Sequence, residues 1–190
     1  YYNANGLLEV YRGSDLNQAV THICLARYSK TPIVNNEMVN KKVLNAQNLK
    51  GRNLAVDWVL QHSDDIEIPC MGGYGPEVSI FKSMYVHTGL SVSKHNCDQR
   101  MLEVLNLIRQ FIDSSEDEQK SFYELYCVLE DPPYGIRKGI IPLFIAYVIR
   151  EYKETAILYF KGKEVELTAS ILSGINDKPE DYTLLLEEGT

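Results

Sequence analysis

The spacing of apolar side chains predicts helices in the first third of the chain. Over residues 15–28 apolar positions recur every three or four residues, as on a helix with one buried stripe. A short helix is expected at 36–40 and a longer one at 46–62, where Asn45 stands in the cap position. Three helices joined by short turns outline a helix-turn-helix-like bundle.

The middle of the chain changes pattern twice. Residues 63–69 alternate acidic and apolar side chains, which fits a short strand or an extended connector, and this is where we expect a domain boundary. A glycine-rich turn at 71–77 leads into a helix over 76–87. A second helix at 98–112 is apolar over more than half of its circumference, so it should be packed on two sides, and a third follows at 122–129.

The last third predicts a helix followed by a β-hairpin. After Asp131-Pro132-Pro133-Tyr134-Gly135, residues 135–149 form an apolar run that reads as a core helix, bent or begun at Pro142. Two strand-like runs, 156–160 and 164–167, flank a Lys-Gly-Lys turn whose Gly162 suits a positive φ. A helix capped by Thr168 and a strand at 182–186 that can pair with the hairpin complete a winged-helix-like unit.

These elements predict a mainly α fold with a small β component (α+β), built from two winged-helix-like or helical-bundle modules. The first module spans residues 1–67 and is helix-turn-helix-like. The second spans residues 68–190 and ends in helix, hairpin, helix and strand. A length of 190 residues with 45% apolar side chains suffices to bury such cores.

Charge is unevenly distributed and limits where a polyanion can bind. The net charge is −7, yet residues 1–62 carry seven basic and four acidic side chains, and the remainder carries 12 and 22. Only the first third is therefore a plausible surface for nucleic acid. The candidate nucleic-acid-binding residues there are Lys41, Lys42, Asn45, Gln47, Lys50 and Arg52, around the start of the 46–62 helix.

A secondary basic pair, Arg137 and Lys138, lies in the C-terminal half. The hairpin lysines Lys161 and Lys163 stand beside several glutamates, so the hairpin is better suited to contacting protein. The alternative for the first basic group is that a basic helix start merely offsets the acidic remainder, because four cations make a small patch. The sequence leaves both interpretations open.

The motifs of the common catalytic centres are missing. The MGGYGPE turn has the glycine spacing of an anion loop, but no GxxxxGK[ST] sequence occurs anywhere in the chain, and no GxSxG elbow either. Cys70, His87, His95 and Cys97 fall in one region, yet their spacing is poor for zinc. We therefore expect no metal site, no cofactor and no catalytic residue.

The cysteines and the hydropathy pattern indicate in which cellular compartment the protein is expected. The four cysteines lie far apart without a CxxC pair, as in a cytoplasmic protein with reduced thiols. No apolar stretch approaches the ~20 residues of a membrane span, so no membrane contact is expected. Both ends read as cuts in a longer polypeptide.

Several segments resemble parts of a known group of proteins. These are TPIVNNEMVNKKVLNAQNLKGRNLAVDWVL, GGYGPEVSIFKSMYVHTGL, DPPYGIRKGIIPLFIAYVI, the LYFKGKEVELT hairpin and NDKPEDYTLL. They are similar to segments in the middle of very large bacterial ATP-binding proteins of phage-defence and restriction islands, including the P-loop proteins of BREX-like systems. The resemblance implies that any ATP binding lies outside these residues, and it carries over no catalytic residue.

Three hypotheses follow for function. The first is a non-catalytic module that binds or positions nucleic acid, with DNA as the candidate partner, within a larger bacterial defence NTPase. The second is a docking or linker domain of the same protein, whose acidic half contacts other domains or subunits without touching nucleic acid. The third is an enzyme with an unfamiliar site, which would need a pocket near Tyr74, Glu77 and His87.

Overall fold

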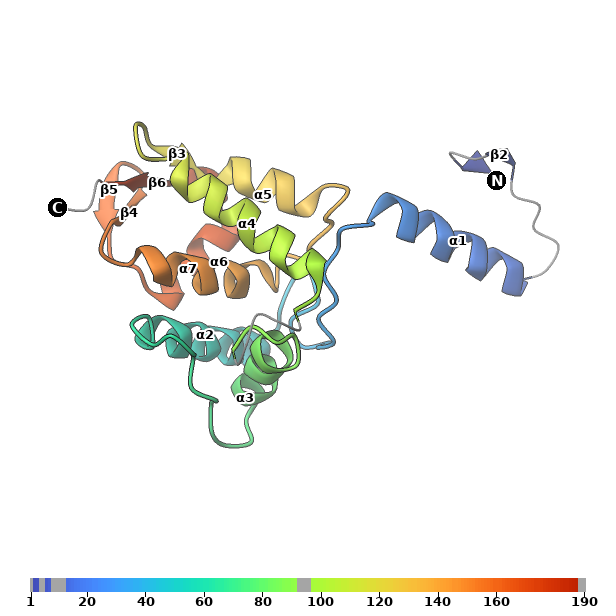
Figure 1. The fold of residues 1–190 in the computed structure, drawn as a ribbon, viewed down its shortest axis with the longest axis horizontal. Coiled ribbons are helices and arrows are strands. Elements are labelled where there is room, and N and C mark those ends of the chain that lie inside the picture. The colour runs from blue at the N-terminus through green and yellow to red at the C-terminus, as the bar shows by residue number, and fades with distance from the viewer. Residues whose placement is uncertain (1, 4–5, 8–12, 92–96, 188–190) are drawn as a thin grey trace.

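The computed structural model describes residues 2–3, 6–7, 13–91 and 97–187 of the chain. The fold is about 53% helical and contains a small four-stranded antiparallel sheet, which confirms the expected mainly α architecture with a small β component (Figure 1). None of the described helices combines the length and the apolar character needed to cross a membrane.

Seven α-helices are described: α1 (Gly13–Arg27), α2 (Ala46–Gln61), α3 (Pro76–Phe81), α4 (Gln99–Asp113), α5 (Phe122–Glu130), α6 (Ile141–Ile149) and α7 (Ala169–Asp177). The π-helical turn η1 (Lys82–Val86) prolongs α3, and the 3-10 turns are η3 (Arg150–Tyr152) and η4 (Pro179–Asp181). The described strands are β1 (Tyr2–Asn3), β2 (Gly6–Leu7), β3 (Lys120–Ser121), β4 (Ala156–Phe160), β5 (Lys163–Val165) and β6 (Tyr182–Leu186). The short helix expected at 36–40 is instead a single turn, closed by the Asn40 amide on the Asn36 carbonyl at 3.0 Å.

Helix α6 is the centre of the fold. All nine of its residues are buried, so it has no solvent-facing side and must be surrounded by other elements. Helices α2, α4 and α7 pack against it. The apolar run predicted over 135–149 becomes helical only at Ile141, with Pro142 in the first turn, where its missing amide hydrogen costs nothing.

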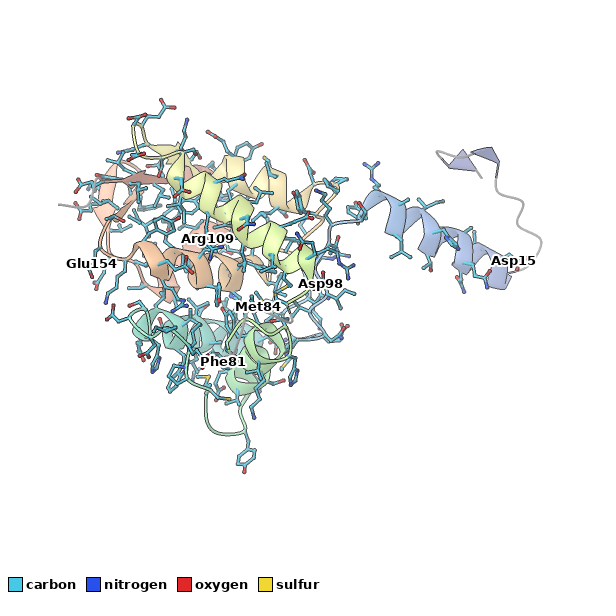
Figure 2. All side chains as sticks on the ribbon, in the orientation of Figure 1. Asp15, Phe81, Met84, Asp98, Arg109 and Glu154 are labelled. Carbon is cyan, nitrogen blue, oxygen red and sulfur yellow. The ribbon has the colours of Figure 1, made fainter. Side chains whose placement is uncertain are left out.

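One hydrophobic core runs through both halves of the chain. Val56 and Val59 of α2 belong to the same buried cluster as Ile145 of α6 and Leu184 of β6. Figure 2 shows side chains filling the space between the helices, with Phe81 and Met84 both fully buried. The inner face of α2 is thus covered by elements from the segment expected as the second module, 68–190, and not by a bundle of residues 1–67 alone.

The expected boundary segment 63–69 is fastened to the body. Ile68 is buried, the indole Nε1 of Trp58 donates to the Pro69 carbonyl at 2.8 Å, and Arg150 donates to the Asp65 carbonyl at 3.1 Å. Such hydrogen bonds to backbone carbonyls hold an extended segment on a surface without pairing it in a sheet.

The sheet has the strand order β3-β6-β4-β5, and every neighbouring pair is antiparallel. Strands β4 and β5 form the predicted hairpin, with Gly162 in its turn at φ +77°, and β6 pairs with β4 from Ala156↔Leu186 to Phe160↔Tyr182. Strand β3 is too short to show in a hydrophobic pattern, which is why the sequence did not predict it.

Helix α1 stands away from the body, joined by the segment that follows Arg27 (Figures 1 and 2). The stripe expected to be buried is largely uncovered, since the exposed fraction is 50% for Val20 and 62% for Leu25. Helical periodicity correctly predicts the helix but does not predict what, if anything, covers its apolar side chains.

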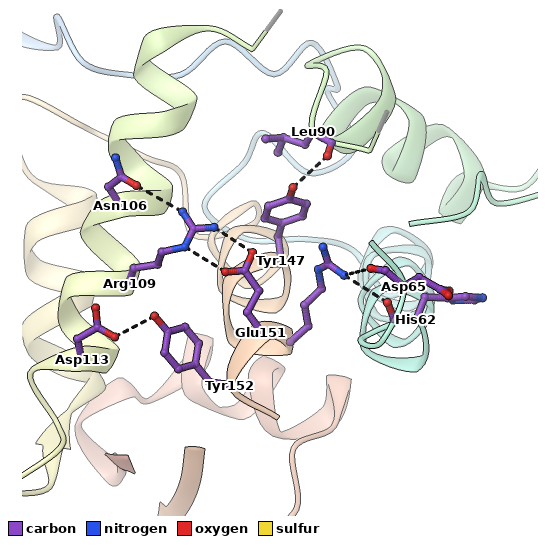
Figure 3. A network of polar contacts seen from close by, with 10 residues as sticks. His62, Asp65, Leu90, Asn106, Arg109, Asp113, Tyr147, Glu151 and Tyr152 are labelled. Atoms are coloured by element: carbon purple, nitrogen blue, oxygen red, sulfur yellow. Dashed lines mark hydrogen bonds and ion pairs between the residues drawn. The ribbon is translucent and has the colours of Figure 1, made fainter. Parts of the chain in front are cut away.

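A polar network ties α4 to the residues that follow α6 (Figure 3). The Arg109 guanidinium makes a bidentate ion pair with Glu151, at 3.1 Å from Nε and 3.0 Å from Nη2, and the Tyr152 hydroxyl donates to Asp113 at 2.9 Å. Bidentate pairs of this kind fix orientation as well as charge. The network holds α4 and η3 in register on one side of the core.

The buried tyrosines should make the folded state less stable at alkaline pH. Burial raises the pKa of Tyr85, Tyr126 and Tyr147, and burial together with the hydrogen bond to Asp113 raises the pKa of Tyr152 to about 12. Above the ordinary tyrosine value of about 10, the unfolded chain loses these protons before the folded chain does. The free energy of unfolding should therefore be unaffected by these groups below about pH 10 and should fall as the pH rises from there toward 12.

The variant Tyr152→Phe should show a shallower fall over that range, measured by urea unfolding at a series of pH values. It should also be slightly less stable at neutral pH, because the hydrogen bond to Asp113 is lost. Tyr74→Phe is the matched control, since Tyr74 is fully exposed at 106% and its variant should follow the wild-type curve. Parallel curves for Tyr152→Phe and wild type would contradict this account.

Candidate anion-binding surface

The turn between α5 and α6 forms one side of the candidate site. The amides of Tyr134 and Gly135 both donate to the Asp131 carbonyl at 3.0 Å, and the Ile136 amide donates to the Leu129 carbonyl at 2.8 Å. Ile136 is buried, which directs the chain back toward the core. The turn thereby fixes the backbone that carries Arg137 and Lys138.

Residues 30–41 lie along this turn from the other half of the chain. The Lys30 amide donates to the Pro133 carbonyl at 3.1 Å, and the Thr31 hydroxyl donates to the Tyr134 carbonyl. Further on, the Gly139 amide donates to the Lys41 carbonyl at 2.9 Å. Two segments about a hundred positions apart in the sequence thus meet through backbone hydrogen bonds.

Two buried asparagines hold the same segment on its other side. The Asn36 amide group donates to the Ser83 hydroxyl at 2.7 Å, and its Oδ1 accepts from the Met38 amide at 3.0 Å. The Asn48 amide group donates to the Met38 carbonyl at 3.0 Å. Because buried amides without partners are costly, these bonds specify one path for the chain.

The result is a shared basic face, which we define as Lys41, Lys42, Arg137 and Lys138. Lys41, Lys42 and Arg137 are exposed. Lys138 is half-buried, 3.8 Å from a Glu130 carboxylate oxygen and 5.9 Å from the centre of the Tyr126 ring. The structure therefore brings together two basic groups that the sequence presents as separate, and no other ion pair involves these four cations among the described residues.

The remaining predicted residues divide into two groups. Gln47 and Lys50 are exposed on α2, whereas Asn45 caps this helix, its Oδ1 accepting from the Asn48 amide at 2.8 Å. Arg52 is only 1% exposed, so it does not lie on the exposed basic surface with the other predicted residues. Burial lowers the pKa of Arg52 from its ordinary value, although an arginine still carries its charge at neutral pH.

The sequence contains a signal that predicts the burial of Arg52. It stands at the i, i+3, i+4, i+7 spacing with Ala55, Val56 and Val59, all of which are buried, and so it lies on the inner face of α2. Lys50 lies outside this pattern and is exposed. Residue type favoured the surface for Arg52, but its helical position favoured the core.

Two pockets adjoin the basic face. The larger, of about 670 Å³, has apolar walls that include Ile33, Ile140 and Phe144, with Lys42, Arg137 and Lys138 in its lining. The smaller, of about 300 Å³, shares Lys42 and Lys138 with the larger one and contains Arg52, Asn176 and Asp177. The two pockets are therefore neighbours separated by two lysine side chains.

The residues considered for a metal site and for an unfamiliar enzyme site do not form such sites in the described part of the chain. No group of three or more histidine, cysteine or carboxylate side chains that can hold a metal ion occurs in the part of the chain described, and His95 lies outside that part. Tyr74, Glu77 and His87 line neither of the two pockets. The arrangement around the basic face can attract and orient an anion.

Comparison with known proteins gives no match to this chain among protein-family models, curated proteins or solved structures.

The contact that joins the two basic segments can be tested at Gly139. A Cβ at this position would lie 2.2 Å from the Val39 carbonyl oxygen and 2.7 Å from that of Lys41. Gly139→Ala should therefore lower the free energy of unfolding by about 1–3 kcal/mol, as overpacking does in well-packed regions. Gly72→Ala is the control, since nothing lies within 4 Å of a Cβ there, and it should change stability by less than about 0.5 kcal/mol. Equal stability of the two variants in thermal unfolding would show that the segments are not in contact.

The structural role of Asn45 can be separated from a role in binding. Asn45→Ala removes the cap of α2 and should cost about 1 kcal/mol, whereas Asn45→Asp keeps an acceptor and should retain wild-type stability within about 0.5 kcal/mol. Chemical denaturation measures both. Gln47→Ala, at an exposed neighbouring position, should be neutral; a loss for Gln47→Ala as large as for Asn45→Ala would contradict the capping role.

Proposed function

We propose that this chain is a non-catalytic module that binds or positions nucleic acid within a larger bacterial defence NTPase. The observation that supports the proposal is that Lys42, Arg137 and Lys138 line one pocket, while the carbonyl of the neighbouring Lys41 accepts from the Gly139 amide. In a chain of net charge −7, a face with four cations and two nearby carboxylates, Glu130 and Asp177, is the part best suited to a phosphate backbone.

The contacts proposed are to phosphate and not to base edges. The cations of the basic face lie on a loop and a turn, and α2, which carries the exposed Gln47 and Lys50, begins directly after this loop. Lysine and arginine on such elements position a strand without reading its sequence. We infer the parent NTPase, its bacterial origin and its role in phage defence from the sequence resemblance.

The C-terminal part fits a winged-helix-like description in this proposal. Helix α6 is followed by the β4–β5 hairpin, by α7 and by β6, which returns to pair with β4. The Lys161 ammonium lies 3.3 Å from an Asp181 carboxylate oxygen, which neutralises the tip of the hairpin. The hairpin is accordingly assigned a structural or docking role, and the nucleic acid is assigned to the basic face.

A second candidate function is docking onto other domains or subunits without nucleic-acid contact. It is favoured by the exposed apolar side chains of α1 and of the segment after it, Val20, Leu25 and Ile33, whose exposed fractions are 50%, 62% and 57%. Under this alternative, charge reversal in the acidic half would abolish co-purification with neighbouring domains, and no DNA binding would be measured at low salt.

Salt dependence tests the nucleic-acid proposal. If four cations contact phosphates, the logarithm of the DNA association constant should fall against the logarithm of salt concentration with a slope of about −3 to −4. Lys42→Gln and Arg137→Gln should each weaken binding and reduce that slope by about 1. Fluorescence polarisation with a labelled duplex measures both quantities.

Lys163→Gln is the matched control for these variants, because Lys163 is an exposed lysine on β5 in the hairpin. It should leave affinity and slope unchanged. Absence of binding at low salt, or equal losses for Lys163→Gln and Lys42→Gln, would overturn the assignment to the basic face.

A further inference from the structure

The smaller pocket contains a buried arginine, Arg52, whose charge has no direct ion pair, although the Asp177 carboxylate in the same lining partly opposes the lowering of the Arg52 pKa by burial. No carboxylate forms an ion pair with Arg52 among the described residues, and its hydrogen bonds go to neutral oxygens. Nη2 donates to the Ser173 hydroxyl at 2.9 Å, while Nη2 and Nε make long contacts with Asn53 Oδ1, at 3.3 and 3.4 Å. Nη1 has no hydrogen-bond partner in the described part of the chain.

Arg150, the other buried arginine, also has no ion pair among the described residues, and its Nε is buried without a hydrogen-bond partner, but its guanidinium is held by backbone carbonyls. It is 7% exposed, and its Nη1 donates to the His62 and Asp65 carbonyls at 3.3 and 3.1 Å (Figure 3). His62 caps the C-terminal end of α2, where the helix dipole favours a cation, and the Arg150 guanidinium also lies 5.1 Å from the centre of the Tyr147 ring. Arg150 lines neither pocket. Arg52 has no such carbonyl partners, and it faces a cavity.

The lining of this cavity carries an excess of positive charge. Lys42, Arg52 and Lys138 contribute three positive charges and Asp177 one negative charge. Asn176, 6% exposed, uses its Oδ1 to accept from the Tyr126 hydroxyl at 3.2 Å, which leaves its amide nitrogen without an acceptor among the described residues. A buried guanidinium, two ammonium groups and an amide donor are the groups that bind a phosphate dianion.

We propose that this pocket binds a phosphate monoester, and that in the bound state this group is the terminal phosphate of a nucleic-acid strand lying on the basic face. The identification of the strand rests on the proposed function, whereas the anion site rests on Arg52 and its pocket. A net lining charge of +2 matches a dianionic monoester better than the monoanionic diester inside a strand. A volume of about 300 Å³ holds a phosphate with its sugar, and the neighbouring pocket of about 670 Å³ offers apolar walls for a base.

Lys42 and Lys138 line both pockets and so connect the two parts of this site. In the bound state they contact the phosphate from the side of the basic face, while Arg52 contacts it from the buried side. The phosphate thereby supplies a direct counter-charge to Arg52, which Asp177 affects without forming an ion pair.

Thermal unfolding with inorganic phosphate tests the anion site by itself. Against sodium chloride of equal ionic strength, phosphate should raise the unfolding temperature by roughly 5–10 °C once its concentration is 100 times the Kd. Arg52→Met keeps the length of the side chain and should abolish the shift without lowering stability in chloride. Arg150→Met is the matched control at a buried arginine and should be destabilised in both salts while keeping the phosphate shift.

Binding of oligonucleotides tests the identity of the ligand. A strand phosphorylated at its end should bind about tenfold or more tightly than the same strand with a terminal hydroxyl, and Lys42→Met should remove this preference. Lys50→Met, at an exposed position of α2 outside both pockets, should keep the preference. Because Lys42 is exposed, its variant tests the proposal even if Arg52→Met does not fold.

The outcomes separate the two proposals. If phosphate raises the unfolding temperature but no oligonucleotide binds, the anion site stands. The proposal that a nucleic-acid strand supplies the phosphate is then overturned, together with the nucleic-acid function. Binding of a mononucleotide would in that case identify a free ligand. The opposite result is salt-dependent DNA binding with equal affinity for the phosphorylated and the hydroxyl-terminated strand, and an unfolding temperature that phosphate does not raise. This result would keep the nucleic-acid function and overturn the anion site. Loss of the preference for the phosphorylated strand in Lys50→Met as well as in Lys42→Met would likewise overturn the anion site.

Discussion

The burial of α6 on all sides is the constraint on which the rest of the structure depends. A helix with nine buried residues out of nine exposes no polar face, so its free energy is favourable only when other elements enclose it. Helix α2 from the first third of the chain, and α4 and α7 from the second half, provide that enclosure. The chain consequently has one core where its sequence suggests two modules.

The packing of α2 against α6 also determines where the basic side chains lie. Because α2 must cover α6, the loop that precedes α2 is brought against the turn that precedes α6, and Lys41 meets Gly139 at a backbone hydrogen bond. The inner face of α2 also carries Arg52 into the interior, beside Lys42 and Lys138. The basic face and the pocket beneath it are both consequences of how one helix is buried.

The sequence predicted those features that depend on a few neighbouring residues, such as helix caps and the hairpin turn. Asn45 and Thr168 cap the helices that they were expected to cap, and Gly162 takes the positive φ expected for the hairpin turn. The pairing of β6 with the hairpin was also predicted, since β6 is an apolar run that follows the hairpin after a single short helix.

What the sequence could not give was the relation between distant segments. The meeting of residues 39–41 with Gly139 depends on a close backbone approach that leaves no periodic signal. The extended segment 63–69 looked like a boundary because its polarity is that of a linker, but its carbonyls accept hydrogen bonds from Arg150 and Trp58. Arg52 lies in the interior although arginine is usually found at the surface, because its helical spacing to Val56 and Val59 places it on the inner face of α2.

The central claim is that segments 39–44 and 135–140 form one surface that binds an anionic partner. Mapping amide chemical shifts by nuclear magnetic resonance during titration with a short oligonucleotide tests this claim most directly. The account predicts that amides of both segments shift together and with the same dissociation constant, while those of the β4–β5 hairpin do not. Shifts confined to one segment, or centred on the hairpin, would contradict it.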